Sequence, residues 1–431
     1  MVLKSWTLGN NLNVLVNKDS YSKEVVIGCA VNYGTNAAPP QQIQLPHLLE
    51  HLVIFNGTKN MSGEEIRETI YSMHKDVNAY TFDDYTYYEI TTTKKNYKAA
   101  LHILSEMVNY ASLLPLSIEV EKKRVRAEIV EESNDKLKLA DKLYSYAACG
   151  LDGSKWVFRE EPDSLARINE TDLQNVFVNF YVPNNMAVFM NSNIDLSEAI
   201  GSIEMHFGNV RPREIVNSSC EKMTDLKKWG MNSTKDDIVI RLAGVADCIS
   251  VIGFEMHGLS AIHGPKELAE KRILFDILSD RFVSYSSLYK PPITYGPKLF
   301  ADECKDICSF SVENVVEYVD FKSLKNRVIR EMGDIAAGNI SKEEFTKSKS
   351  YLKDAYSLTG GTGIPDESHC ESMAMYSMLM RRTDYDEYVK SIKDISIRSV
   401  RNLARTIDPH RFTSVLVVPE NKRPTYSKAK R

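Results

Sequence analysis

The sequence predicts an α+β fold made of two tandem homologous domains. Strand-like and helix-like segments follow one another in a similar order in each half, and a polar stretch with prolines and charges separates the halves. Halves of about 210 residues can each enclose a hydrophobic core. Hydrophobic residues make up 43% and charged residues 26% of the 431-residue chain, as in ordinary globular proteins. We therefore predict domains at residues 1–210 and 233–431, joined by a linker at 211–232.

The first half begins with β-rich sequence. Residues 7–17 predict a hairpin around a Gly-Asn-Asn turn, and the apolar run 25–31 has the length of a buried strand. Ser62 suits the start of a helix that continues to Met73. The β-forming residues 77–90 predict paired strands with an acidic turn. The remaining segments are expected to be a strand at 186–190 and helices at 97–110, 118–148, 165–181 and 196–207.

The second half repeats this order of elements. Strands are expected at 237–242, 248–256, 295–300, 308–312 and 411–418, and helices at 266–278, 321–337, 342–356 and 371–381. The repetition supports a duplicated domain.

Composition and charge exclude several classes of partner. The formal net charge is −4, so the sequence indicates neither nucleic-acid nor anionic-membrane binding. The chain lacks an apolar run long enough for a transmembrane helix, and its start does not look like a signal peptide. Its seven cysteines are odd in number and scattered, which favours reduced thiols. We therefore expect a cytoplasmic protein.

The segment Pro46-His47-Leu48-Leu49-Glu50-His51 carries the clearest chemical signal. Positions four apart share one face of a helix, so the two histidines can point at one spot with Glu50 beside it. Two imidazoles and a third protein ligand leave zinc an open position for water, whose proton a nearby carboxylate can take. The alternative is that these are ordinary helical histidines at the border of a core.

Two later segments allow both a structural and a functional interpretation. Glu121 and Glu128, two helical turns apart in a charged helix, share a face that is either solvated or turned towards a metal. The aromatic-rich strands at 77–90 either pack within a sheet or offer a free edge to an extended peptide.

Together, these motifs resemble the M16 family of zinc metallopeptidases, of pitrilysin, insulinase or mitochondrial-processing-peptidase type, in its small two-domain M16B form. The His-x-x-Glu-His order is the inverzincin signature. In this family a glutamate 77 positions after the second histidine is the third ligand, and a second glutamate precedes it by seven. The segments 78–81, 86–88 and 165–185 also resemble the family. The resemblance implies a LuxS/MPP-like metallohydrolase fold, in which each domain has a mostly antiparallel sheet packed with helices.

The resemblance implies a role for each residue of the motif. His47, His51 and Glu128 would bind Zn²⁺, and Glu50 would be the general base. Glu121 would orient a histidine ligand.

The resemblance also implies a substrate-binding edge strand. The backbone there would pair with the peptide, so specificity must come from elsewhere. The residues are Asn78, Ala79, Tyr80, Thr81 and Phe82.

The second half departs from the family pattern, in which an arginine stands seven residues before a tyrosine. Tyr295 fits the tyrosine, either as a catalytic residue or as a core residue, but Leu288 replaces the arginine. Arg281 lies too early and Lys290 has the wrong spacing. A chain with an intact zinc half and a degenerate arginine half predicts a heterodimer, in which a paralogous M16 subunit supplies the missing pair. A homodimer is the alternative.

The predicted function is zinc-dependent endopeptidase activity on peptides or unfolded segments within a closed chamber. Leader-peptide removal from ribosomally made peptides is the role we favour, with general oligopeptide degradation or presequence removal as alternatives. Two rival interpretations are a non-catalytic scaffold or core subunit and an ordinary α+β binding protein with an accidental motif.

Overall fold

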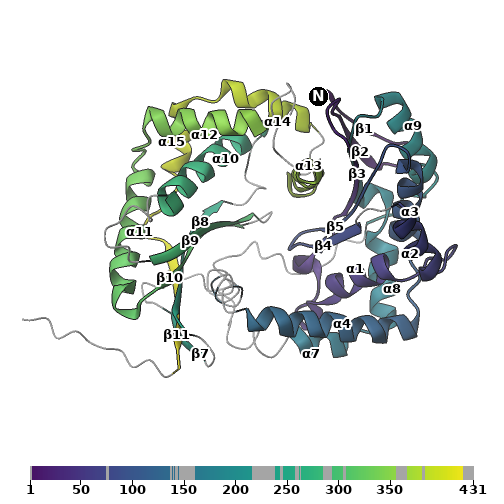
Figure 1. Cartoon of the computed structure of the whole chain (residues 1–431), viewed down its shortest axis with the longest axis horizontal. Coiled ribbons are helices and arrows are strands. Elements are labelled where there is room, and N and C mark those ends of the chain that lie inside the picture. The colour runs from purple at the N-terminus through teal and green to yellow at the C-terminus, as the bar shows by residue number, and fades with distance from the viewer. Residues whose placement is uncertain are drawn as a thin grey trace, which may run out of the picture. The chain divides into compact units, whose positions relative to one another are not determined.

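The described part of the chain forms two compact units (Figure 1). The computed structural model describes residues 2–73, 77–135, 161–215, 238–242, 246–257, 264–284, 294–303, 307–355, 366–380 and 384–420, with residues 138, 140, 144 and 262 besides. Unit 1 takes its residues from 1–129, 159–221 and 354–389, and unit 2 from 130–158, 222–353 and 390–431. The predicted α+β class is confirmed, because each unit combines helices with one mostly antiparallel sheet. The predicted linker lies outside the described residues beyond position 215.

The sheet of unit 1 has six strands in the order β1-β2-β6-β3-β5-β4. All neighbouring strands are antiparallel except the parallel pair β2 and β6. The predicted hairpin is confirmed, with Asn11 at a φ of 66° in its turn. The strands are β1 (Val2–Thr7), β2 (Asn13–Lys18), β3 (Val25–Val31), β4 (Val77–Thr81), β5 (Thr86–Thr92) and β6 (Met186–Ser192).

Helices cover both faces of this sheet. In Figure 1, α13 lies on one side of the strands and α3 and α9 lie on the other. Every residue of β3, β5 and β6 is buried, as expected for strands enclosed on both faces. The helices are α1 (Leu45–Phe55), α2 (Gly63–Ser72), α3 (Tyr97–Tyr110), α4 (Pro115–Asn134), α7 (Glu161–Arg167), α8 (Glu170–Phe180), α9 (Leu196–Phe207) and α13 (Asp366–Met380).

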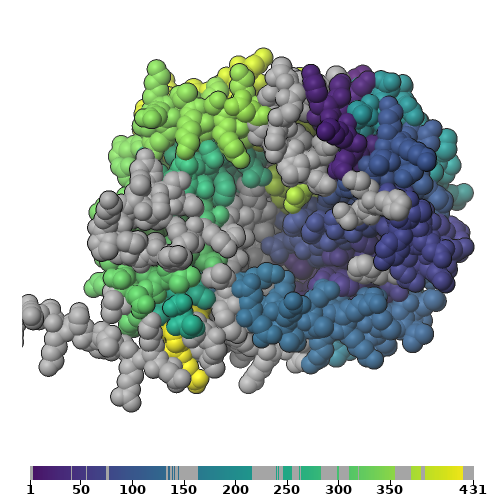
Figure 2. Space-filling model, viewed as in Figure 1, coloured from purple at the N-terminus to yellow at the C-terminus, as the bar shows by residue number. Residues whose placement is uncertain are grey.

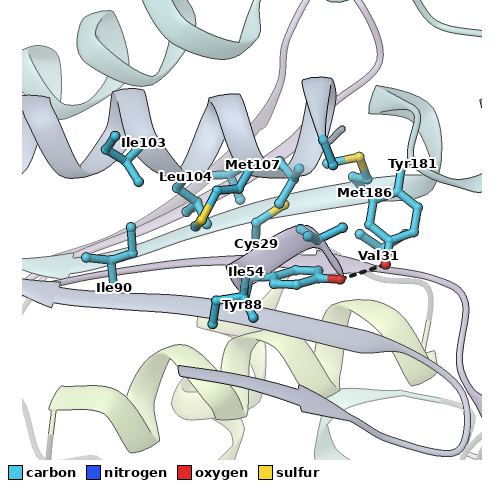
Figure 3. Close-up of a cluster of buried hydrophobic side chains, with 14 of the residues drawn as sticks. Cys29, Val31, Ile54, Tyr88, Ile90, Ile103, Leu104, Met107, Tyr181 and Met186 are labelled. Atoms are coloured by element: carbon cyan, nitrogen blue, oxygen red, sulfur yellow. Dashed lines mark hydrogen bonds between the residues drawn. The ribbon is translucent and has the colours of Figure 1, made fainter. Parts of the chain in front are cut away.

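The core beneath α3 is apolar, with one hydrogen-bonded pair of tyrosines (Figure 3). Cys29 of β3 and Met107 of α3 point towards each other across the interior. The hydroxyl groups of Tyr88 and Tyr181 form a 2.7 Å hydrogen bond, so neither buried hydroxyl lacks a partner. Burial raises the pKa of both tyrosines, which therefore stay neutral.

The sheet of unit 2 has five strands in the order β7-β11-β8-β10-β9, with β7 and β11 parallel. The strands are β7 (Ile238–Leu242), β8 (Cys248–His257), β9 (Thr294–Glu303), β10 (Ile307–Val316) and β11 (Phe412–Pro419). The helices are α10 (Pro265–Ser279), α11 (Phe321–Ala336), α12 (Lys342–Ala355), α14 (Tyr385–Ser391) and α15 (Ile397–Ala404). None of the helices in the described part of the chain has the length and apolarity needed to span a membrane.

The structure differs from the sequence prediction at several elements. The single helix expected at 165–181 is two helices, because Asn169 and Asp172 form a capping box that starts α8 as a new helix. The short helices α14 and α15 were not expected. α13 follows unit 2 strands in the chain but packs against β3 and β6 of unit 1. Of the expected helix at 118–148, the part after α4 lies largely outside the described residues.

Gly28 of β3 provides a test of the packing around this sheet. A Cβ atom at this position would lie 2.3 Å from the Tyr87 hydroxyl oxygen and 2.5 Å from a ring carbon. Tyr87 is buried and donates a 2.6 Å hydrogen bond to Glu89, so it has little freedom to move. We expect Gly28→Ala to lower the free energy of unfolding by about 1–3 kcal/mol. The measurement is urea denaturation of the purified chain.

Gly9→Ala is the matched control for this prediction. A Cβ atom there would meet no other atom within 4 Å, so we expect a much smaller change. Equal stability of the Gly28→Ala variant and the wild type would contradict the packing argument.

Candidate metal centre

α1 presents both histidines because its other faces are buried in unit 1. Pro46 occupies the first turn, where a missing N–H has no cost, and six apolar residues of the helix are buried. α1 packs against β4, β5, α3, α7 and α8. This packing fixes the rotation of the helix about its axis. The imidazoles of His47 and His51 therefore project on one side, with ring centroids 5.0 Å apart. The buried apolar residues are Leu45, Leu48, Leu49, Leu52, Val53 and Ile54.

Glu128 of α4 brings a third ligand atom to the two imidazoles. Its Oε2 atom lies 3.5 Å from Nε2 of His47 and 3.2 Å from Nε2 of His51. The His51 side chain is 6% exposed, that of His47 26% and that of Glu128 49%. Among the described residues, these three form the one group of histidine, cysteine and acidic side chains whose donor atoms all lie within 4.8 Å of one another. Two distant helices therefore supply one cluster.

The other nitrogen of each imidazole lies against an oxygen atom. Nδ1 of His51 is 3.4 Å from Oε2 of Glu121, which is buried and accepts a 2.8 Å hydrogen bond from Arg124. Nδ1 of His47 is 3.0 Å from Oε1 of Gln44. An oxygen acceptor at Nδ1 favours the tautomer that leaves the Nε2 lone pair free, which is how metal-binding histidines are usually held. Sequence reasoning missed Gln44 and Arg124. Their spacing of three residues from His47 and Glu121 was the available signal.

The geometry of this cluster fits zinc. Two ligand atoms that each lie about 2.1 Å from a tetrahedral ion are about 3.4 Å apart, close to the distances of Glu128 Oε2 from the two Nε2 atoms. Two imidazole nitrogens and one carboxylate oxygen are also the donor set of many catalytic zinc sites. Exposure of Glu128 leaves one side of the cluster open to solvent. A fourth, exchangeable position is therefore compatible with the site.

The electrostatic environment of the cluster is negative. Burial would lower the pKa of His51, but the hydrogen bond with Glu121 and the charges of Glu128 and Glu50 outweigh burial, and the pKa is raised. Burial raises the pKa of Glu50, although a hydrogen bond from Thr81 opposes this. Three carboxylates around two imidazoles create a site that favours a cation.

β4 lies at the edge of the sheet, as the predicted substrate-binding strand should. It pairs with β5 on one side, and no strand of the described part of the chain pairs with its other side. Its side chains alternate: Asn78 and Tyr80 are exposed, whereas Ala79 and Thr81 are half-buried on the side of α1. Phe82 follows the strand, in the turn to β5. A free edge next to the histidine cluster suits pairing with an extended peptide.

The guanidinium of Arg281 makes hydrogen bonds within unit 2. Its guanidinium donates to Asp334 at 2.7 Å, to Glu344 at 2.6 Å and to the carbonyl of Asn339 at 2.6 Å. These bonds and its 11% side-chain exposure assign it a structural role. Leu288 lies outside the described residues, and Tyr295 lies near the start of β9, with its side chain outside what the structure describes.

Two family models match the chain. The model described as insulinase (peptidase family M16) matches residues 13–150, and the model described as the peptidase M16 inactive domain matches residues 167–352. The first match contains all the residues of the cluster.

Curated relatives and a solved structure match nearly the whole chain. A Bacillus subtilis protein called uncharacterized zinc protease YmxG is 21% identical over 431 residues, which cover 98% of this chain and all of that protein. The β subunit of the yeast mitochondrial-processing peptidase (Saccharomyces cerevisiae) is 23% identical over 420 residues, covering 90% of this chain and 85% of that subunit. The crystal structure of a Helicobacter pylori protease superposes with a TM-score of 0.80 at 16% identity, covering 97% of this chain and 99% of that one. That structural likeness shows the fold.

Replacement of a ligand tests the metal centre. We expect Glu128→Gln to reduce zinc bound per chain after dialysis, because an uncharged amide is a weaker ligand than a carboxylate. Inductively coupled plasma mass spectrometry measures the zinc. Glu119→Gln on α4 is the matched control, since Glu119 is an exposed residue paired with Lys122. Equal zinc content in the Glu128→Gln variant and the wild type would contradict the assignment.

Proposed function

The chain belongs to the M16 family of peptidases, and on that premise we propose that it is a zinc-dependent endopeptidase acting on extended peptides. The observation that carries the proposal is the convergence of His47, His51 and Glu128, with Glu50 next to His51 on the same helix. A scaffold subunit or a binding protein would have no need of this complete set of side chains.

The residues of unit 1 divide the chemistry between them. When bound, zinc would polarise a peptide carbonyl and lower the pKa of water. Glu50, which precedes His51 on α1, would accept the proton from the attacking water. Glu121 and Gln44 would hold the imidazoles in the orientation that binds the metal. The positioning roles of Glu121 and Gln44 rest on their described contacts with the imidazoles.

The edge of β4 would bind the substrate as an added strand. Backbone pairing contributes affinity and fixes the peptide in extended form, with little dependence on its sequence. Only an unfolded segment can pair in this way, so folded proteins would be excluded. The exposed side chains of Asn78 and Tyr80 would then contact the substrate.

We further propose that the active form is a heterodimer with a paralogous M16 subunit. Leu288 stands where the family has its arginine. Arg281 is hydrogen-bonded to two carboxylates and one carbonyl within unit 2, so it is not available to take the place of that arginine. The yeast relative is by name one subunit of a larger enzyme, which supports this proposal. The partner would supply the arginine–tyrosine pair and close the chamber around the peptide. Leader-peptide removal from ribosomally made peptides is the role we favour for such an assembly.

Glu50→Gln tests the endopeptidase directly. We expect it to lower kcat by about 100- to 10,000-fold, because the amide cannot accept the proton. Zinc content should stay near that of the wild type, since Glu50 is not among the clustered ligand atoms. The measurement is cleavage of internally quenched peptides, with and without the partner subunit. Unchanged cleavage by Glu50→Gln would refute the proposal.

The quaternary proposal needs its own experiment. We expect the isolated chain to cleave peptides slowly and a mixture with an arginine–tyrosine paralogue to cleave them faster. The mixture should elute from gel filtration as a two-chain complex. Full activity of the chain alone, as a homodimer, would contradict the heterodimer proposal but not the endopeptidase proposal.

A further inference from the structure

The hydroxyl group of Thr81 joins the edge strand to the base. Its Oγ1 atom donates a 2.7 Å hydrogen bond to Oε2 of Glu50. Thr81 is the last residue of β4, and Glu50 lies in the middle of α1. The contact therefore connects the element that would pair with a peptide to the helix that carries the reactive carboxylate.

Glu50 depends on this bond for its orientation. The residue is 7% exposed, so bulk solvent can offer its carboxylate few hydrogen bonds. Among the described residues, Thr81 is the one that donates a hydrogen bond to it. Glutamate has three rotatable side-chain bonds, and a buried carboxylate held by nothing would sample several positions. A β-branched threonine has few rotamers, so its hydroxyl group is a rigid donor.

The position of Thr81 is itself fixed by its neighbours. Its backbone pairs with Thr86 of β5. The next residue, Phe82, accepts a 3.2 Å hydrogen bond from the Thr35 amide at its carbonyl, and its own amide donates to Tyr85. Gly34 lies so close to this turn that an added Cβ atom would be 2.3 Å from the Phe82 carbonyl oxygen. The end of β4 is thus anchored on the loop that precedes α1.

We propose that Thr81 is a positioning residue, which holds the Glu50 carboxylate in register with a peptide paired to β4. The assignment rests on the proposed peptidase function and extends it. The strand presents its backbone edge for pairing, and the Thr81 side chain points towards α1. Movement of the strand and movement of the Glu50 carboxylate are therefore coupled. The carboxylate would keep a fixed position relative to the scissile bond of a peptide paired with β4.

Two substitutions separate the hydroxyl group from the shape of the side chain. Thr81→Val keeps the branched shape and removes the donor, and we expect it to lower kcat about 10- to 100-fold with little change in KM or zinc content. Thr81→Ser keeps the donor and should retain most of the activity. The assay is cleavage of an internally quenched peptide by the full chain, with its partner subunit if that is required.

The matched control lies on the opposite edge of the same sheet. Thr7 of β1 is exposed, and its hydroxyl group donates to the Asn13 side chain. Thr7→Val should therefore leave kcat unchanged. A Thr81→Val variant with wild-type kcat, or a Thr81→Ser variant as slow as Thr81→Val, would overturn the assignment.

A second measurement requires no activity. In zinc-free protein, urea midpoints of Thr81→Val, Glu50→Ala and the double variant form a double-mutant cycle. We expect non-additive shifts, because each single variant removes the same hydrogen bond. Additive shifts would overturn the contact. A wild type without peptidase activity would instead contradict the proposed function, and the cycle would still decide whether Thr81 holds Glu50.

Discussion

The contact on which the rest of the site depends is that of the Glu128 carboxylate with the imidazoles of His47 and His51. α1 cannot rotate to meet the carboxylate, because its leucines are buried in the core of unit 1. α4 must therefore present Glu128 at the right place, and the same face of α4 presents Glu121 two turns earlier. One helix face thus supplies a candidate metal ligand and the carboxylate that contacts a second candidate ligand, His51. In Figure 2, α4 forms a blue band at the surface.

The same arrangement brings the proposed peptide-binding strand and the proposed base to one edge of the sheet. β4 pairs only with β5 among the described strands, and its half-buried side faces α1. A peptide added to this edge would lie beside β4, whose last residue, Thr81, is bonded to Glu50. Main-chain pairing and proton transfer would then share a rigid support, as catalysis at a fixed geometry requires.

The second half of the chain has two structural roles that its sequence pattern did not predict. Arg281 ties the end of α10 to α11 and α12 through Asp334 and Glu344. α13 covers the face of β3 and β6 opposite to α3 and α9, so the sheet that supports the cluster depends on residues 366–380. Without this helix, two strands that are buried on both faces would be exposed to water, at a large hydrophobic cost.

The order of the elements was determined by the sequence, because hydrophobic periodicity and capping residues act locally. The strands β3 and β6, the helix α9 and the Ser62 capping box lie where these patterns predict them. The spacing of His47 and His51 also follows from helix geometry alone. Glu128 could be chosen from the sequence only through family resemblance. Its contact with the histidines depends on how α4 packs, which no local pattern encodes.

The tertiary structure alone decided which side chains support these residues. Gln44 and Arg124 looked like ordinary polar residues, and Thr81 was expected to act through its backbone. Their roles arise where separate elements meet, and such contacts depend on packing between segments far apart in the chain. The placement of α13 has the same origin. Burial of apolar surface is favourable whichever sheet the helix packs against, and not only against the sheet nearest to it in sequence.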